Sequence, residues 1–203
     1  MTVRRIPFAE SVGKSDLLNW LGVLLGVVFP ALVYFGRGVV SPQALALVLI
    51  LVVWTRKRIA FGLRVNFWLV AGGLLLAALA LRSNDALPLK LYPVLVNGAL
   101  LGIFVFSLRF PPTVAERAAR LRLPDLPPFV VAYTRKVTKA WCIFFAANAL
   151  IALWTAVWSS DRMWFFYNGC IAYVLVGVMF AGEWFVRRRV LRGLHLSQSF
   201  GAD

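Results

Sequence analysis

The residue best placed to do chemistry within an apolar stretch is a single carboxylate. Glu183 lies in the segment FAGEWFVRRR, after apolar residues and before a run of arginines. Carboxylates within a membrane are costly and often serve as proton relays or substrate counter-ions. Arg187 lies four residues further on, so an interfacial ion pair on one helical face is the competing interpretation. Pairing of Glu183 with Arg135 or Lys139 of a neighbouring helix is a third.

Amides and phenols form a second group of candidate side chains. They lie deeper in apolar segments, where each asparagine needs a hydrogen-bond partner because no water is at hand. They could line a polar cleft for a lipid headgroup or carrier, or act only as hydrogen-bonded contacts between helices. The sequence leaves both open. The group comprises Asn97, Asn148, Asn168, Tyr92, Tyr167 and Tyr173.

The sequence carries no recognisable catalytic or cofactor motif. P-loop, GxSxG, HExxH and GxGxxG patterns are all missing. Cys142 and Cys170 lack CxxC spacing, and the single histidine, His195, lies in the C-terminal tail. We therefore predict no catalytic residue, no cofactor and no metal. An enzyme that holds a diphosphate between arginines and Glu183 stays an alternative.

The elements that position these side chains follow from hydropathy. Of the 203 residues, 61% are hydrophobic and 15% charged, with a mean hydropathy of +0.80, whereas a soluble domain carries about a quarter charged residues. A bilayer core needs about 20 apolar helical residues. We predict an all-α polytopic membrane bundle, a single domain over residues 1–203. Its six helices are expected at 17–35, 39–54, 65–81, 91–107, 139–158 and 163–186.

The distribution of positive charge predicts the orientation of these helices. The net charge is +14, but the cations cluster between apolar runs, which favours an anionic membrane leaflet over nucleic acid. With six helices, one side carries 18 cations and the other only Arg37, Arg82, Lys90 and Arg162. Cytoplasmic loops are the cation-rich ones. We therefore expect both termini in the cytoplasm, with a retained first helix rather than a signal peptide.

The connector at 108–138 contains a predicted short helix. Thr113 and Glu116 have capping-box spacing after two prolines, and Pro124 stops the pattern, so we expect a helix over about 114–123. The helix could lie flat on the inner leaflet or serve only as a cytoplasmic connector.

A longer helix should follow without a break from Pro128 to the Ser159–Ser160 pair. About 30 residues span about 45 Å, more than the hydrocarbon core, so its first third should stand in the cytoplasmic interface with Trp141 at the boundary. Snorkelling side chains would then form a cytoplasmic basic collar. The predicted collar comprises Arg117, Arg120, Arg122, Lys136, Lys139, Arg187, Arg188 and Arg189.

Two glycine pairs, Gly22 with Gly26 and Gly98 with Gly102, have small-xxx-small spacing. Such pairs let a second helix approach closely, and within a bundle we expect internal packing rather than dimerisation.

Residues 88–190 resemble a known group of proteins. The stretches KLYPVLVNGALLGIFVFSL, RLRLPDLPP, AYTRKVTKAWCIFFAANALIALWTA and WFFYNGCIAYVLVGVMFAGEWFVRRR are similar to small bacterial inner-membrane proteins often encoded in aryl-polyene (xanthomonadin-like) pigment clusters. More distantly, the chain resembles the septation protein A family. The residues that carry the first match are Tyr92, Pro93, Asn97, Thr134, Arg135, Trp141, Phe144, Phe145, Asn168, Gly169, Tyr173, Glu183 and Arg188.

The resemblance implies a cellular setting and no reaction, since neither family supplies a catalytic residue to carry over. We expect an accessory or scaffold protein for making or moving an envelope lipid, such as an aryl-polyene conjugate. Its partners would be membrane lipids, an acyl carrier protein or other envelope-biosynthesis proteins, and not nucleic acid. The alternatives are a septation or envelope-maintenance scaffold and a small lipid transporter. Oligomeric state is not predicted.

Overall fold

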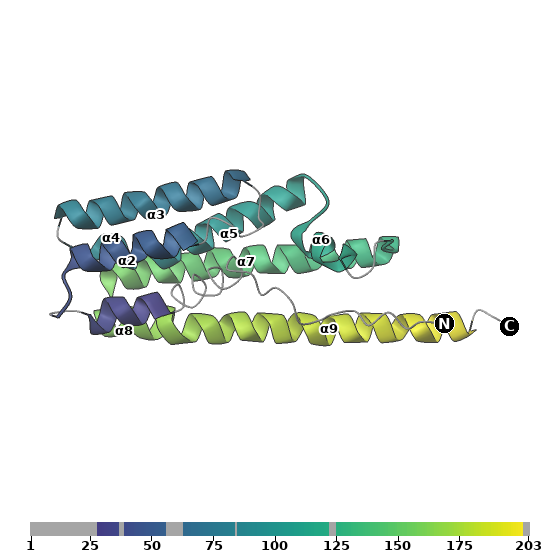
Figure 1. Ribbon diagram of the computed structural model, residues 1–203. Helices are drawn as coiled ribbons and strands as arrows, with labels where there is room; N and C mark the ends of the chain where they lie inside the picture. The colour runs from purple at the N-terminus through teal and green to yellow at the C-terminus, as the bar shows by residue number, and fades with distance from the viewer. Residues whose placement is uncertain (1–27, 37–38, 56–62, 84, 122–124, 201–203) are drawn as a thin grey trace, which may run out of the picture. The chain divides into compact units, whose positions relative to one another are not determined.

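A computed structural model of the chain describes residues 28–36, 39–55, 63–83, 85–121 and 125–200, without the side chains of 51–55, 63–70 and 189–200. All regular elements in these ranges are helices, which confirms the predicted all-α class (Figure 1). The chain divides into two compact units, Met1–Leu89 and Lys90–Asp203, each described here by itself. The prediction of one domain over 1–203 stays a prediction.

The first unit contains a helical stretch at 28–35, then α2 (Pro42–Thr55) and α3 (Leu63–Ser83). Helices α2 and α3 pack against each other. On α2, Leu45 and Leu49 are buried one turn apart; on α3, Ala77 and Ala80 are buried. Small residues on α3 let the two backbones approach closely. The expected first helix, 17–35, lies within the described residues only from position 28, and Gly22 and Gly26 lie outside them.

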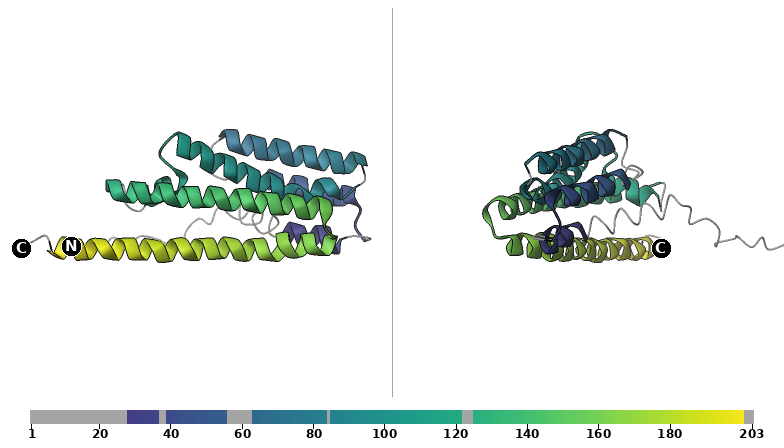
Figure 2. Two further views of the ribbon diagram at one scale, coloured as in Figure 1. Left: turned by 180° about the vertical axis from the view of Figure 1, so that it is seen from behind. Right: turned by 60° about the vertical axis from the view of Figure 1, so that its left-hand side comes forward.

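The second unit is built around α7 (Pro128–Trp158), which has α5 (Tyr92–Arg109) along one side. A short helix, α4 (Leu87–Lys90), ends where this unit begins. After α7 the chain turns back into α8 (Asp161–Phe166), a π-helical turn η2 (Tyr167–Ile171) and α9 (Ala172–Phe200). Figures 1 and 2 show α9 running antiparallel to α7.

The packing of α7 follows a repeat of four and three residues. Thr134, Thr138, Trp141, Phe145 and Asn148 are buried, and the alternation continues through Ala152 and Thr155. This spacing keeps one seam of a helix facing its neighbours over several turns. The seam carries hydroxyl, amide and aromatic groups rather than leucines, so its stability depends on specific polar and ring contacts.

Local sequence signals fix the ends of these helices. Helix α7 begins with a proline, whose missing backbone N–H costs nothing there, because N–H groups in the first turn have no partner within the helix. The helix ends before Ser159, as predicted. Ser160 then caps α8, its hydroxyl accepting from the Met163 amide at 3.4 Å. Helix α6 (Val114–Arg120) begins where the capping spacing predicted but ends three residues earlier than the expected position 123.

Within the described residues, three helical stretches are long and apolar enough to cross a membrane. They are Leu87–Arg109 with 23 residues, Pro128–Trp158 with 31 and Asp161–Arg188 with 28. At about 1.5 Å per residue each exceeds the roughly 30 Å of hydrocarbon. The chain therefore has the build of a helical membrane protein.

Candidate functional site

A chain of hydrogen bonds crosses the second unit from η2 through α7 to α5. The Tyr167 hydroxyl donates to Asn148 Oδ1 at 2.7 Å. Asn148 Nδ2 then donates to Asn97 Oδ1 at 2.9 Å. Asn97 Nδ2 in turn donates to the Pro93 carbonyl at 2.8 Å. Because all three donors point the same way along the chain, each bond polarises the next. The asparagines are buried, and Asn148 is only 6% exposed.

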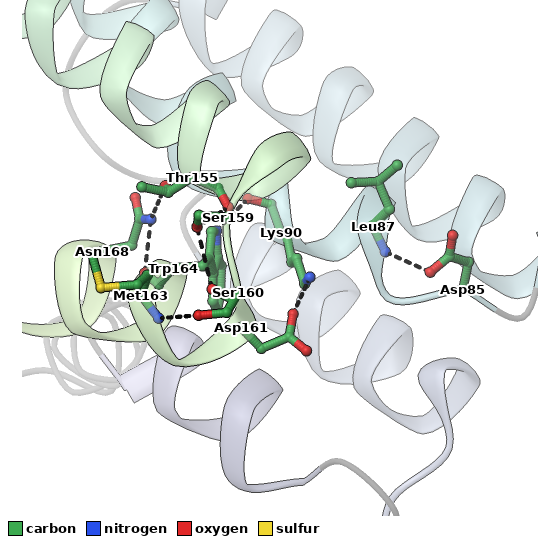
Figure 3. Close-up of polar contacts among 10 residues, drawn as sticks. All are labelled: Asp85, Leu87, Lys90, Thr155, Ser159, Ser160, Asp161, Met163, Trp164 and Asn168. Carbon is green, nitrogen blue, oxygen red and sulfur yellow. Dashed lines mark hydrogen bonds and ion pairs between the residues drawn. The ribbon is translucent and has the colours of Figure 1, made fainter.

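Asn168 belongs to a separate contact between η2 and α7. Its Nδ2 lies 3.1 Å from Thr155 Oγ1 and 3.0 Å from the Trp164 carbonyl (Figure 3). Thr155 was not among the predicted site residues. Its burial, 2% exposed, follows from its place on the α7 seam.

Two adjacent residues of a π-helical turn both reach α7. The turn covers Tyr167–Ile171 and carries a bond from the Ala172 amide to the Tyr167 carbonyl, five residues apart. Tyr167 binds Asn148 and Asn168 binds Thr155. Such π-turns inside helices are often found at functional sites.

An ion pair and a buried indole connect α8 to Lys90, at the start of this unit. Lys90 Nζ contacts Asp161 Oδ1, and Trp164 Nε1 donates to the Lys90 carbonyl at 3.1 Å (Figure 3). Trp164 is fully buried. The indole thus ties α8 to Lys90, the last residue of α4. Sequence reasoning missed this pairing, because 74 residues separate the two groups.

Trp141 also lies in the interior of the unit. Its side chain is 8% exposed. Ring centroids of Phe145 and Phe180 lie 5.4 and 4.8 Å away, and Phe104 of α5 lies at 6.3 Å. Its place on the α7 seam turns the ring between α5 and α9, and its depth at the membrane boundary stays a prediction.

Glu183 pairs with Arg187 of its own helix, at 3.8 Å between Oε1 and Nε. The Tyr133 hydroxyl of α7 donates to the Glu183 backbone carbonyl at 3.3 Å, which brings the start of α7 beside this part of α9. Arg188 stacks over the Trp184 ring at 3.7 Å, a cation–π geometry. Neither Arg135 nor Lys139 contacts the Glu183 carboxylate, although both helices meet here.

Arg135, Lys136 and Lys139 instead lie on the outer side of α7, where all three are exposed. With about 3.6 residues per turn, they fall within an arc of about 100°. Tyr133, which contacts α9, and Thr138 on the buried seam lie outside that arc. Among the residues that the structure describes, these three cations have no ion pair or hydrogen-bonded partner. We call them the α7 cation triad.

The remaining described members of the predicted collar already have partners. Arg120 binds Glu116 on α6, with Nη2 to Oε1 at 2.8 Å. Arg117 Nε donates to the Pro112 carbonyl at 3.0 Å. Arg122 and the side chain of Arg189 lie outside the described residues.

Helix α6 packs on α7 rather than standing alone as a surface helix. Thr113 accepts from the Glu116 amide at 3.3 Å, as its capping spacing predicted. Thr113 and Glu116 are both buried. Ser107 at the end of α5 accepts from the Val114 amide at 3.2 Å. Helix α6 is thus held against α5 and α7, and whether it also lies flat on the inner leaflet stays a prediction.

The remaining predicted features are two tyrosines and a glycine pair. Tyr173 is 39% exposed on α9, whereas Tyr92 is buried on α5. At Gly98 and Gly102 an added Cβ would meet no described atom within 4 Å. The expected internal packing of this glycine pair is therefore not seen within the described part of the chain.

No cluster of metal ligands forms within the described ranges, where groups of three or more His, Cys, Asp or Glu side chains do not meet. Cys142 and Cys170 are free thiols.

Comparison with known proteins returned no matching family, no matching curated protein and no matching solved structure.

Proposed function

We propose that this chain is a six-span inner-membrane protein with both termini in the cytoplasm, and that it serves as an accessory or scaffold protein for making or moving an envelope lipid. The setting of aryl-polyene pigment synthesis comes from the sequence resemblance alone. The observation that carries the scaffold role is how the second unit uses its polar groups. Asn97, Asn148 and Tyr167 bind one another, and Asn168 binds Thr155.

These contacts leave the amides engaged with protein rather than directed to a ligand. Both polar atoms of the Asn97 and Asn148 side chains have a protein partner. A substrate bound at mid-membrane would have to displace these bonds, and each amide would then need a new partner in a dry environment. This supports a structural role for the asparagines and favours a scaffold over a transporter with a central polar site.

The orientation is supported by the charges at the two ends of the second unit. At the end where α5 stops and α7 starts, eight arginines and lysines whose side chains the structure describes stand against Glu116, Asp125 and Glu183. At the other end Lys90 and Arg162 stand against Asp161. The cation-rich end is the one expected on the cytoplasmic side.

The test is lipid and pigment mass spectrometry on a clean deletion strain, with and without a plasmid copy of the gene. We expect one polyene or lipid intermediate to accumulate and the plasmid copy to clear it. That intermediate would identify the blocked step. An unchanged lipid and pigment profile in cells that become long or leaky would overturn the proposal and favour a septation-like envelope role.

A further inference from the structure

We infer that the outer face of α7 binds the anionic phosphate headgroup of a membrane lipid, with Arg135, Lys136 and Lys139 as its ligands. This inference rests on the proposed function, because it names the class of molecule that the scaffold would hold. It commits to an intact lipid rather than to a soluble protein partner.

The first step is that the α7 cation triad is uncompensated. The nearest cations on α9 are already engaged: Arg187 with Glu183, and Arg188 with the Trp184 ring. Within the described part of the chain, the triad has no carboxylate, carbonyl or ring partner. Three cations within two turns of one helix repel each other. An anion bound between them would relieve that repulsion and gain charge-assisted hydrogen bonds.

The second step is that an apolar stripe continues from the triad along the same face. Ile143, Leu150, Trp154 and Val157 are all exposed. At about 100° per residue they fall in the same angular sector as Lys136 and Lys139. This face therefore offers cations at one end and only apolar and aromatic surface beyond. A lipid, with a charged head and apolar chains, has the same order of groups.

The third step is depth. From Lys139 to Trp158 the helix rises about 28 Å, close to the hydrocarbon thickness of a bilayer. Trp158 is exposed at the far end of this stretch, where an indole prefers the interface. Lys139 then lies at the level of the lipid phosphates, and Arg135 lies one turn further toward water.

The experiment compares two charge-matched double variants of the full-length protein in detergent. One is Arg135→Gln with Lys139→Gln, and the other is Arg187→Gln with Arg188→Gln. Native mass spectrometry would follow binding of phosphatidylglycerol, with phosphatidylcholine as the neutral probe. Each interfacial cation is worth about 1 kcal/mol toward an anionic lipid. We therefore expect the first double variant to weaken phosphatidylglycerol binding by at least about tenfold and the second by less than about twofold.

Two further arms secure the interpretation. The charge-preserving variant Arg135→Lys with Lys139→Arg should bind like the wild type, which shows that binding depends on the charges at these two positions. A wild-type unfolding transition in the glutamine variant excludes a folding defect. Excess inorganic phosphate should not displace the lipid, because it lacks the acyl chains that lie on Ile143 and Leu150. If free phosphate competes at the affinity of the lipid, the site is a phosphate site and the lipid assignment falls.

If both double variants weaken phosphatidylglycerol binding equally, the binding depends only on the net charge of the protein, and the proposed site is overturned. Undiminished lipid binding in the Arg135 and Lys139 variant would also overturn it, including a result in which that variant loses only an acyl carrier protein. The proposed function has its own readout, the lipid profile of the deletion strain. A changed profile together with a negative binding result would retain the scaffold role without this headgroup site.

Discussion

Asn148 donates its side-chain amide to Asn97 Oδ1 at 2.9 Å, joining α7 to α5 across 51 residues of sequence. The bond lies in the interior of the second unit, where water cannot replace either partner. Because Tyr167 donates to the same Asn148 side chain, one residue connects three helical elements. Because its hydrogen bonds are made within the protein, a polar residue is tolerated near the middle of the long helix α7.

Replacement of Asn148 by leucine should lower the free energy of unfolding, although leucine makes α7 more hydrophobic. The substitution removes two interhelical hydrogen bonds and leaves Asn97 Oδ1 and the Tyr167 hydroxyl without partners. Interhelical hydrogen bonds in membranes are worth about 0.6 kcal/mol on average and up to about 1.7, so we expect a loss of about 1–3 kcal/mol. Reversible unfolding in mixed detergent would measure it.

The matched control for that prediction is Leu150→Ala, an exposed position on the same helix, which should change stability by less than about 0.5 kcal/mol. A double-mutant cycle between Asn97→Ala and Asn148→Ala should show coupling. Strict additivity of the two changes would mean that the hydrogen bond contributes nothing.

Replacement of Asp161 by asparagine should also destabilise the second unit. Lys90 is buried, and its ammonium loses the carboxylate of Asp161. Removing one partner of a buried pair costs about 3–5 kcal/mol. Asp161 is 28% exposed at its side chain, so about 1–3 kcal/mol is the expected loss in a thermal or detergent unfolding assay.

The charge-swapped variant Lys90→Asp with Asp161→Lys should recover only part of that loss. It restores the attraction but places a cation in the first turn of α8, where the helix dipole favours an anion. Full recovery would show that the dipole has no role, and no recovery would show that the ion pair itself is unimportant.

Substitution of Gly169 by alanine should be less favourable than the same change at Gly177. A Cβ at Gly169 would lie 2.9 Å from Phe165 Cε2, whereas one at Gly177 would meet no described atom within 4 Å. Alanine is favoured over glycine in a helix by about 1 kcal/mol, so Gly177→Ala should be neutral or stabilising. We expect Gly169→Ala to be less stable than Gly177→Ala by about 1 kcal/mol or more.

The same unfolding assay can show whether the Phe165 ring is responsible. Adding Phe165→Leu should relieve part of the penalty of Gly169→Ala, because the shorter side chain leaves room for the methyl group. If the double variant is no better than the sum of its parts, the crowding at η2 is not the cause.

Glu183→Gln should have a small effect. Its carboxylate pairs with Arg187 across a single helical turn at 3.8 Å, and such pairs contribute about 0.3–0.5 kcal/mol. We expect near-normal protein levels and an unchanged lipid and pigment profile in complemented deletion cells. Loss of product at normal protein level would instead make Glu183 a functional carboxylate and support the enzyme alternative.

The positions of the polar side chains along the sequence correctly identified where helices meet, but not what each residue contacts. Asn97, Asn148 and Asn168 were all candidates for a cleft or for helix contacts, and the structure connects the first two and separates the third. Thr155, Lys90 and Trp164 were not singled out, because a threonine or tryptophan within an apolar run carries no sign of its partner. Only spacing along the α7 seam could have suggested Thr155.

The sequence by itself determined the helical class, the membrane setting and several helix ends. These depend on local physics: apolar length, proline at the start of α7, and the capping residues Thr113 and Ser160. The tertiary structure decided which face of each helix is buried, and so placed Trp141 in the interior and Arg135 outside. It also decided that Lys90 meets Asp161 and Asn148 meets Asn97. Such pairings join residues that are distant in the sequence, and neither hydropathy nor local spacing can predict them.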